Sequence, residues 1–276
     1  MFIRHPLIGT RRRTSLSLAR QCGILPGDIM AKYRKPPIGE AVCELRFIPS
    51  APWDLAVPGL IYERLRTAFP KRRQVKVLDS AIQLQTQATL HQFVTTDRLQ
   101  CVSEDEKDVV GIGPNVLAIS RLDPYKGWEQ FRPTIMKALD AYSEVVSAKA
   151  LQRAGLRYLN QIAFDEERVE LSDFFDLYPF VGKSLPQDYG PFFVGIQTAY
   201  DDSLNVLRVN LGSTFPSPAP LRLSMMLDID YFLGKPEGIA IADIEQWLNQ
   251  GHDRVASVFE GSIKGRLRAR FEEEKA

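Results

Sequence analysis

Tyr33-Arg34-Lys35-Pro36-Pro37-Ile38-Gly39-Glu40-Ala41-Val42-Cys43-Glu44-Leu45-Arg46-Phe47 is the most regular stretch of the chain. Its second part alternates between two faces, an apolar one of Ala41, Cys43, Leu45 and Phe47 and a mostly polar one of Glu40, Val42, Glu44 and Arg46. This period of two is typical of a strand with one face in the core. The two prolines restrict the backbone just before it. The stretch therefore predicts a half-buried β-strand with a rigid start.

The remainder of the chain alternates between runs of strands and long helices. Further strands are expected at residues 81–94, 99–102, 109–122 (broken at 111–115), 156–164, 192–200, 204–211 and 221–231. Helices are expected at 53–69, 128–146 and 169–177, and after Asp243, whose side chain would form a capping box with Gln246. Lys71-Arg72-Arg73 is expected in a loop, and residues 266–275 as a charged tail.

This order predicts an α+β protein with an antiparallel sheet and long helices on one face. Each half of the chain runs strand, helix, three strands, long helix. We therefore predict a pseudo-duplicated β-α-β-β-β-α architecture, with residues 30–150 as the first half and 151–276, including the C-terminal helix, as the second.

Composition indicates an ordinary globular protein that does not need disulfides or metals for stability. The chain has 276 residues, of which 45% are hydrophobic and 25% charged. Its three cysteines include no closely spaced pair, which favours a reducing compartment and argues against a zinc site. No run approaches the ~18 apolar residues that span a bilayer. We expect a soluble, cytoplasmic protein.

Charge is distributed unevenly along the chain. Five arginines against one aspartate give residues 1–29 a charge of +4, so the remaining residues carry −3. A slightly acidic body lacks the field that draws a protein to nucleic acid or to an anionic membrane. Arg11-Arg12-Arg13 is similar to targeting segments, but no apolar stretch follows it. We expect residues 1–29 to be a disordered leader, or translation to start at Met30.

Glu40, Glu44 and Arg46 are the first candidate binding residues, because they share one face of the predicted strand. One interpretation is a polar patch that recognises a ligand or a partner. The other is a solvent-exposed face with one ion pair, which contributes ~0–1 kcal/mol to stability.

His252 is the second candidate binding residue. Histidine titrates near neutral pH, and Asp253 follows it directly. Adjacent side chains do not face each other on a helix, however, so a boundary position with one hydrogen bond is the alternative. His5 and His91 are the other two histidines and form no cluster with it in the sequence, so no metal site is predicted.

Other motifs carry no complete catalytic arrangement. Asp228 and Asp230 share a strand face and could hold Mg²⁺, but without a phosphate cradle an outward sheet face is the better account. Gly111-Ile112-Gly113 is expected as a bulge or turn, since no third glycine follows. No Gly-x-Ser-x-Gly motif is present. We assign no catalytic residue, metal or cofactor.

The chain resembles an uncharacterised bacterial protein family of about this length with a scattered distribution. Members begin with a Tyr-x-x-Pro-Pro-Ile-x-Glu-Ala segment, matched here by residues 33–41. They end in a helix with Trp-Leu, His-Asp and Phe-Glu pairs, matched by Trp247-Leu248, His252-Asp253 and Phe259-Glu260. The family brings no established activity. Its distribution implies an accessory role, as in mobile or defence-type bacterial systems.

Two functions remain open. The first is a non-enzymatic interaction protein that presents its sheet face or a helix groove to a protein partner, or that self-associates. The alternative is a small-molecule or nucleotide-binding module, with catalysis an open question, whose cavity lies between sheet and helix. Nucleic-acid binding is a weaker third idea, because it needs a basic face that the average charge conceals.

Overall fold

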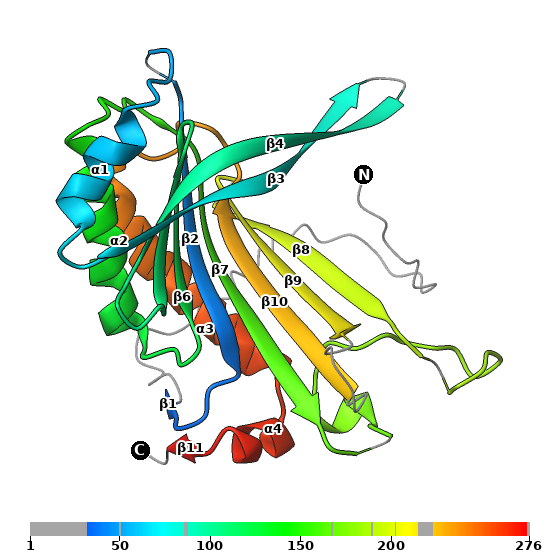
Figure 1. Cartoon of the computed structure of the whole chain (residues 1–276). Helices are drawn as coiled ribbons and strands as arrows, with labels where there is room; N and C mark the ends of the chain where they lie inside the picture. Colours follow the sequence, from blue (N-terminus) through cyan, green and yellow to red (C-terminus); the bar gives the residue numbers. More distant parts are fainter. Residues whose placement is uncertain are drawn as a thin grey trace, which may run out of the picture. The chain divides into compact units, whose positions relative to one another are not determined.

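Strand β2 (Ile38–Phe47) lies near the middle of a nine-stranded antiparallel sheet with the order β3-β4-β5-β6-β2-β7-β10-β9-β8 (Figure 1). The structure is a computed structural model that describes residues 32–49, 51–85, 88–166, 168–188, 190–201, 203–214 and 223–274, and only the backbone of 78–95. The expectations for residues 1–29 lie outside this range.

The other strands of the large sheet vary in length from six to fifteen residues. They are β3 (Lys71–Gln85), β4 (Ala88–Val102), β5 (Asp108–Gly113), β6 (Val116–Leu122), β7 (Leu151–Phe164), β8 (Phe193–Tyr200), β9 (Asn205–Thr214) and β10 (Leu223–Leu233). Strand β4 pairs with β5 only through Leu99–Val102, so the long β3–β4 hairpin extends beyond its neighbours (Figure 1).

Four α-helices and a small sheet complete the described fold. The helices are α1 (Val57–Leu65), α2 (Trp128–Ser143), α3 (Ile244–Ser262) and α4 (Gly265–Arg270), with 3-10 turns at Leu171–Asp173 and Ile241–Asp243. The small sheet joins β1 (Lys32–Tyr33) to β11 (Glu273–Glu274).

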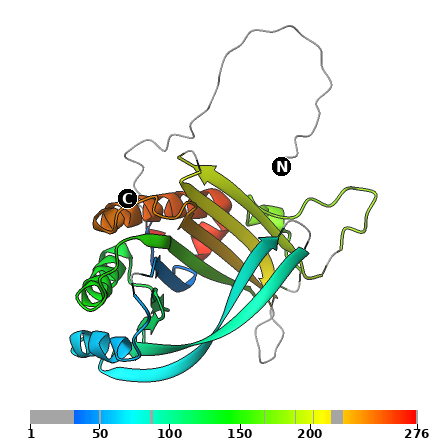
Figure 2. The same ribbon diagram turned by 90° about the horizontal axis from the view of Figure 1, so that it is seen from above.

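The alternation of β2 is confirmed, because its apolar face is buried and its polar face is not. Ala41, Cys43 and Leu45 have no exposed surface, whereas Glu40 and Glu44 are half-buried. Helix α2 packs against β6, and α3 packs against β7 and β10. In Figure 2 the helices line one side of the sheet. The prediction of an α+β fold with long helices on one face is therefore correct.

The sheet runs outward from its centre in a similar way on both sides. From β2 the order is β6, β5, β4, β3, and from its neighbour β7 it is β10, β9, β8, so the first half has four strands between its two helices where three were expected. In each half the first strand, β2 or β7, lies at the centre of the sheet. It pairs with the strand that precedes the long helix of that half, which is β6 or β10. Such an order is what duplication would produce, and duplication itself remains a prediction, as does the division at residue 150.

Three expectations in the first half of the chain are wrong. The single strand expected at 81–94 is instead the end of β3 and the beginning of β4. Lys71-Arg72-Arg73 opens strand β3 and pairs with β4, where a loop was expected. Charged residues are common on an edge strand such as β3, because they discourage pairing with other chains. Gly111-Ile112-Gly113 continues β5, and the turn follows at Asn115, whose φ is 55°.

Three expectations in the second half also need correction. The helix expected at 169–177 is only a 3-10 turn at Leu171–Asp173, and the buried residues there are Leu171, Phe174 and Phe175. Asp243 precedes α3 without a side-chain capping bond, because a 3-10 turn leads directly into the helix. Residues 266–275 include α4 and β11 and are not simply a tail.

The two motifs that carry the family resemblance meet in space. The hydroxyl of Tyr33 donates to the carboxylate of Glu260, with distances of 2.8 and 2.9 Å to its two oxygens. The ring of Tyr33 also packs edge-on against Phe259 and Phe271. Burial raises the pKa of both Tyr33 and Glu260, so the proton of the hydrogen bond stays on the tyrosine. Tyr33 therefore connects the start of the motif at residues 33–41 to the end of α3.

None of the helices in the described part of the chain is long and apolar enough to cross a membrane.

Candidate functional site

The side of the sheet that faces away from the helices carries an alternating set of acids and arginines. We call it the polar sheet face and define it by eight residues of β2, β7, β9 and β10: Glu40, Glu44, Arg46, Arg153, Arg157, Arg208, Asp228 and Asp230. These eight residues, four acids and four arginines, carry no net charge together.

An ion-pair chain crosses three neighbouring strands of the polar sheet face. Within β2, the Nε of Arg46 donates to Glu44 at 2.8 Å. Arg153 of β7 donates from one nitrogen to Glu44 at 3.3 Å and from another to Asp230 of β10 at 3.4 Å. Arg153 thus joins the predicted residues Glu44 and Arg46 to an acid 186 positions further along the chain from Glu44.

A second pair lies beside the first. Arg157 forms a two-pronged contact with Asp228, at 2.7 and 2.8 Å. This geometry fixes the guanidinium plane as well as the distance, and it is among the stronger arrangements of an ion pair. Asn210 of β9 donates to the same carboxylate at 3.3 Å. Glu40 is half-buried at the start of β2, and it adds to the effect of Asp228 in raising the pKa of Arg157.

Sheet geometry explains why these side chains meet. Arg153 and Arg157 are four positions apart on β7 and thus on one face, and Gly155 lies between them. A Cβ at Gly155 would lie 3.0 Å from a nitrogen of Arg153, so the glycine leaves room for that guanidinium. The register places Asp230 directly opposite Arg157, next to Asp228.

The acids of β10 are buried and the residues around them remain accessible. Asp228 and Asp230 lie on the outward sheet face, as expected, but only 8% and 7% of their surface is exposed. The side chains of Arg157 and Arg46 are 48% and 36% exposed. Burial raises the pKa of Asp230, and the charge of Arg153 opposes this effect.

Phe232 of β10 places an apolar ring among the charged side chains of the polar sheet face. The guanidinium carbons of Arg153 and Arg208 lie 4.9 and 5.3 Å from its ring centre. Both are within the range of cation–π attraction. Arg208 also donates to Gln197 of β8 at 3.1 Å, so the polar contacts continue to the edge of the sheet.

His252 lies on the other side of the sheet, in a separate cluster between α2 and α3. Its Nδ1 is 3.1 Å from the hydroxyl of Tyr158, which is 3.0 Å from the hydroxyl of Tyr125. Its ring stacks on Trp128 at 4.6 Å between centres. The structure therefore does not bring together all four predicted residues: Glu40, Glu44 and Arg46 share one face, and His252 belongs to the helix layer.

Burial lowers the pKa of His252 to about 4. The imidazole is therefore neutral at pH 7, and the same burial raises the pKa of Tyr158. A weak base beside a weak acid is a poor arrangement for proton transfer near neutral pH. The cluster better fits a structural role, in which it connects α3 to α2 and β7.

This arrangement predicts a pH dependence of stability. The unfolded chain binds a proton at His252 below about pH 6.5, and the folded chain only near pH 4, so stability falls as pH decreases between these values. We expect this group to reduce the unfolding free energy by about 2 kcal/mol between about pH 7 and about pH 5. Urea melts of wild type and His252→Gln test this. An equally steep dependence in the variant would contradict the neutral, buried assignment.

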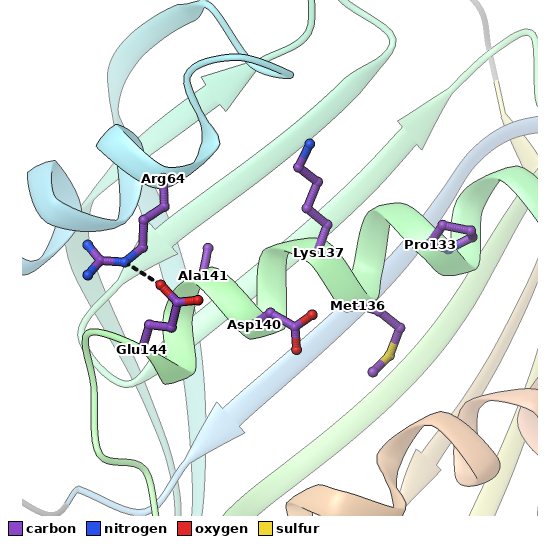
Figure 3. Close-up of a pocket in the computed structure, with 7 residues that line it drawn as sticks. All are labelled: Arg64, Pro133, Met136, Lys137, Asp140, Ala141 and Glu144. Carbon is purple, nitrogen blue, oxygen red and sulfur yellow. Dashed lines mark hydrogen bonds and ion pairs between the residues drawn. The ribbon is translucent and has the colours of Figure 1, made fainter.

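A separate hollow of 430 Å³ lies against α1 and α2 (Figure 3). Its lining residues carry charges of both signs: Arg64, Pro133, Met136, Lys137, Asp140, Ala141 and Glu144. Arg64 and Glu144 form an ion pair at 2.7 Å across one end. The hollow contains neither His252 nor any residue of the polar sheet face.

Sequence reasoning missed the arginines of β7. Arg153 and Arg157 are four positions apart and Asp228 and Asp230 are two apart, so each pair shares a strand face, but no local pattern shows that the two strands are neighbours. Tyr125, Trp128 and Tyr158 had no comparable signal around His252. Within the described residues, no group of three or more histidine, cysteine or acidic side chains is placed to hold a metal ion.

Comparison with known proteins adds no relative: no family model matches the chain, and neither a curated protein nor a solved structure is significantly similar to it.

Proposed function

We propose that this chain is a non-enzymatic interaction protein that binds a partner protein through the polar sheet face. The observation that supports the proposal is that the face has a buried layer and an exposed layer of charged side chains, which we call its two-level construction. Buried acids on β10 hold Arg153 and Arg157 in place, while Glu44, Arg46 and Arg157 keep exposed surface. Side chains that are fixed before binding lose little conformational entropy when a partner arrives.

The charge of the face favours a protein over a nucleic acid as its partner. Four acids and four arginines alternate across it, whereas nucleic acids are bound by surfaces with an excess of cations. A partner of matching pattern would present both signs of charge, and such complementarity provides specificity more than affinity. The face would therefore select one partner among many proteins.

The alternative function, a small-molecule or nucleotide-binding module, has weaker support. It requires a cavity between sheet and helix that contains Glu44, Arg46 or His252. The hollow in Figure 3 lies against α1 and α2 instead, and four of its seven lining residues are charged. Ligand pockets are usually enclosed and mainly apolar.

We further propose that the protein acts in the cytoplasm, as an accessory component of a mobile or defence-type bacterial system. Cys43 and Cys101 support the location, because both are buried free thiols with raised pKa values and suit a reducing compartment. The accessory role rests on the family resemblance alone.

Alanine substitutions on the exposed part of the face test the proposal. We expect Glu44→Ala and Arg46→Ala each to lower the unfolding free energy by less than ~1 kcal/mol, because a partly exposed ion pair contributes little. Each variant should nevertheless lose the partner that wild type retains. A urea melt that shows a loss of several kcal/mol would instead make these residues structural.

A further inference from the structure

Strand β8 forms one edge of the nine-stranded sheet and differs from every other strand in it. Among the described residues, no strand pairs with its outer side. Its sequence, Phe193 to Tyr200, contains no charged residue, whereas each of the other eight strands contains at least one. The opposite edge, β3, begins with Lys71-Arg72-Arg73. Charged side chains therefore discourage the addition of another strand at the β3 edge, and the β8 edge has no such charges.

Hydrogen bonding shows which backbone groups of β8 face outward. The amide of Ser213 donates to the carbonyl of Phe192 at 3.1 Å, so residue 192 faces β9. Successive residues of an antiparallel strand alternate between the two sides. Even-numbered residues therefore bond to β9, and Phe193, Gly195, Gln197 and Ala199 direct their N–H and C=O groups outward.

Two large apolar side chains on β8 remain exposed. Phe193 is 73% exposed on the side of the polar sheet face, and Ile196 is 54% exposed on the opposite side. Their strand neighbours on β9, Gly212 and Val209, leave the outer flank of each side chain uncovered. An uncharged strand with exposed apolar residues on both sides is suited to pairing with another strand.

We infer that β8 pairs with β8 of a second copy of this chain, in an antiparallel arrangement with Ile196 on the twofold axis. Ile196 then faces the partner's Ile196. Phe193 pairs with the partner's Ala199, and Gly195 pairs with the partner's Gln197. The two nine-stranded sheets become one continuous sheet across the dimer.

This register follows from the positions of the free backbone groups. A twofold axis at Ile196 engages all four outward-facing residues of each copy, which gives about eight backbone hydrogen bonds. An axis at Gln197 would engage only three, because Phe193 would face the partner's Asp201, whose φ of 51° ends the strand. It would also place Gln197 side chains at the axis and leave Ile196 away from its copy.

The uncharged edge also explains why a second copy is the occupant. In the Ile196 register no charged side chain of β8 meets another, and a small residue lies opposite Phe193. Self-pairing needs no further partner and does not involve Glu44, Arg46 or Arg153, which lie on β2 and β7. Variants of β8 and of the polar sheet face therefore test different claims.

Cysteine cross-linking tests the dimer and its register together. In a Cys22→Ser background, we expect Ile196→Cys to form a covalent dimer under mild oxidation. Directly opposed residues at this kind of position lie about 4.5 Å apart between Cα atoms, within the range of a disulfide. Gln197→Cys is the matched control and should remain monomeric on a non-reducing gel, because it faces the partner's Gly195.

Light scattering of the native protein provides the second measurement. We expect wild type to be a dimer, and Ile196→Lys to raise the dissociation constant by at least roughly tenfold, because two like charges would meet at the axis. A monomeric wild type would overturn the inference, as would a dimer that Ile196→Lys leaves intact. Cross-linking through Gln197→Cys in place of Ile196→Cys would overturn the register.

Discussion

Arg153→Met is expected to lower the unfolding free energy by about 3 kcal/mol at pH 7, the usual cost of removing one member of a buried ion pair. Arg153 is the residue that joins Glu44 to Asp230, and Asp230 is only 7% exposed. Methionine keeps much of the packing against Phe232 but leaves the carboxylate of Asp230 without this cation. Urea denaturation measures the loss.

The pH dependence separates this cause from a loss of packing. Burial already raises the pKa of Asp230, and removing Arg153 raises it further. Protonation of this carboxylate then removes part of the cost of burying its charge, which Arg157 and Arg208 compensate only partly, so the loss should shrink as pH falls. Arg46→Met is the matched control, since Arg46 lies at the exposed end of the same chain, and should cost less than ~1 kcal/mol. Equal losses in both variants would contradict the two-level construction.

Trp247→Ala is expected to have a larger effect, about 4 kcal/mol, because it removes a large buried ring from the contact between α3 and β10. Trp247 is 4% exposed and packs on Tyr231 at 5.1 Å between ring centres. Its indole N–H donates to the side-chain oxygen of Asn205 at 2.8 Å. Asn205 is itself buried, so the substitution also leaves a buried acceptor without its donor.

Two further variants assign this loss to packing and to hydrogen bonding. Trp247→Phe keeps an aromatic ring but removes the N–H, and we expect it to cost about 1–3 kcal/mol. Phe180→Ala removes an aromatic side chain that is 90% exposed and should change stability by less than ~0.5 kcal/mol. A Trp247→Ala variant as stable as Phe180→Ala would show that α3 does not depend on this contact.

The parts of the fold that the sequence predicts are those with a local periodic pattern. The alternation from Ala41 to Phe47 correctly predicts both the strand and its buried face. The helical stripe that includes Trp128 and Phe131 does the same for α2. In both cases the pattern repeats within one element, so no knowledge of distant residues is needed.

Edge position and long-range pairing are the parts that the sequence conceals. Lys71-Arg72-Arg73 has the composition of a loop, and it forms a strand because its backbone pairs with residues 100–102 of β4. Similarly, the contact of Arg153 with Asp230 depends on β7 lying beside β10, 77 positions away. Strand order of this kind is set by the packing of the whole sheet.

The candidate site was predicted only in part, for the same reason. Glu44 and Arg46 are neighbours on one strand face, so a local pattern identifies them. The arginines that connect them to β10 come from another strand, and nothing local marks them as partners. His252 was expected at the border of the apolar stripe of α3, and its contact with Tyr158 spans 94 positions of the chain.

Native mass spectrometry of the protein, purified gently from its own host, tests the central claim most directly. Wild type should be compared with a Glu44→Arg, Arg46→Glu double variant, which reverses the exposed pair at constant net charge. We predict that a polypeptide of another sequence accompanies wild type and is absent from the folded variant, whereas a second copy of this chain would accompany both. A polypeptide of another sequence that both proteins retain would contradict binding through the polar sheet face. A bound small molecule in its place would contradict the interaction function itself.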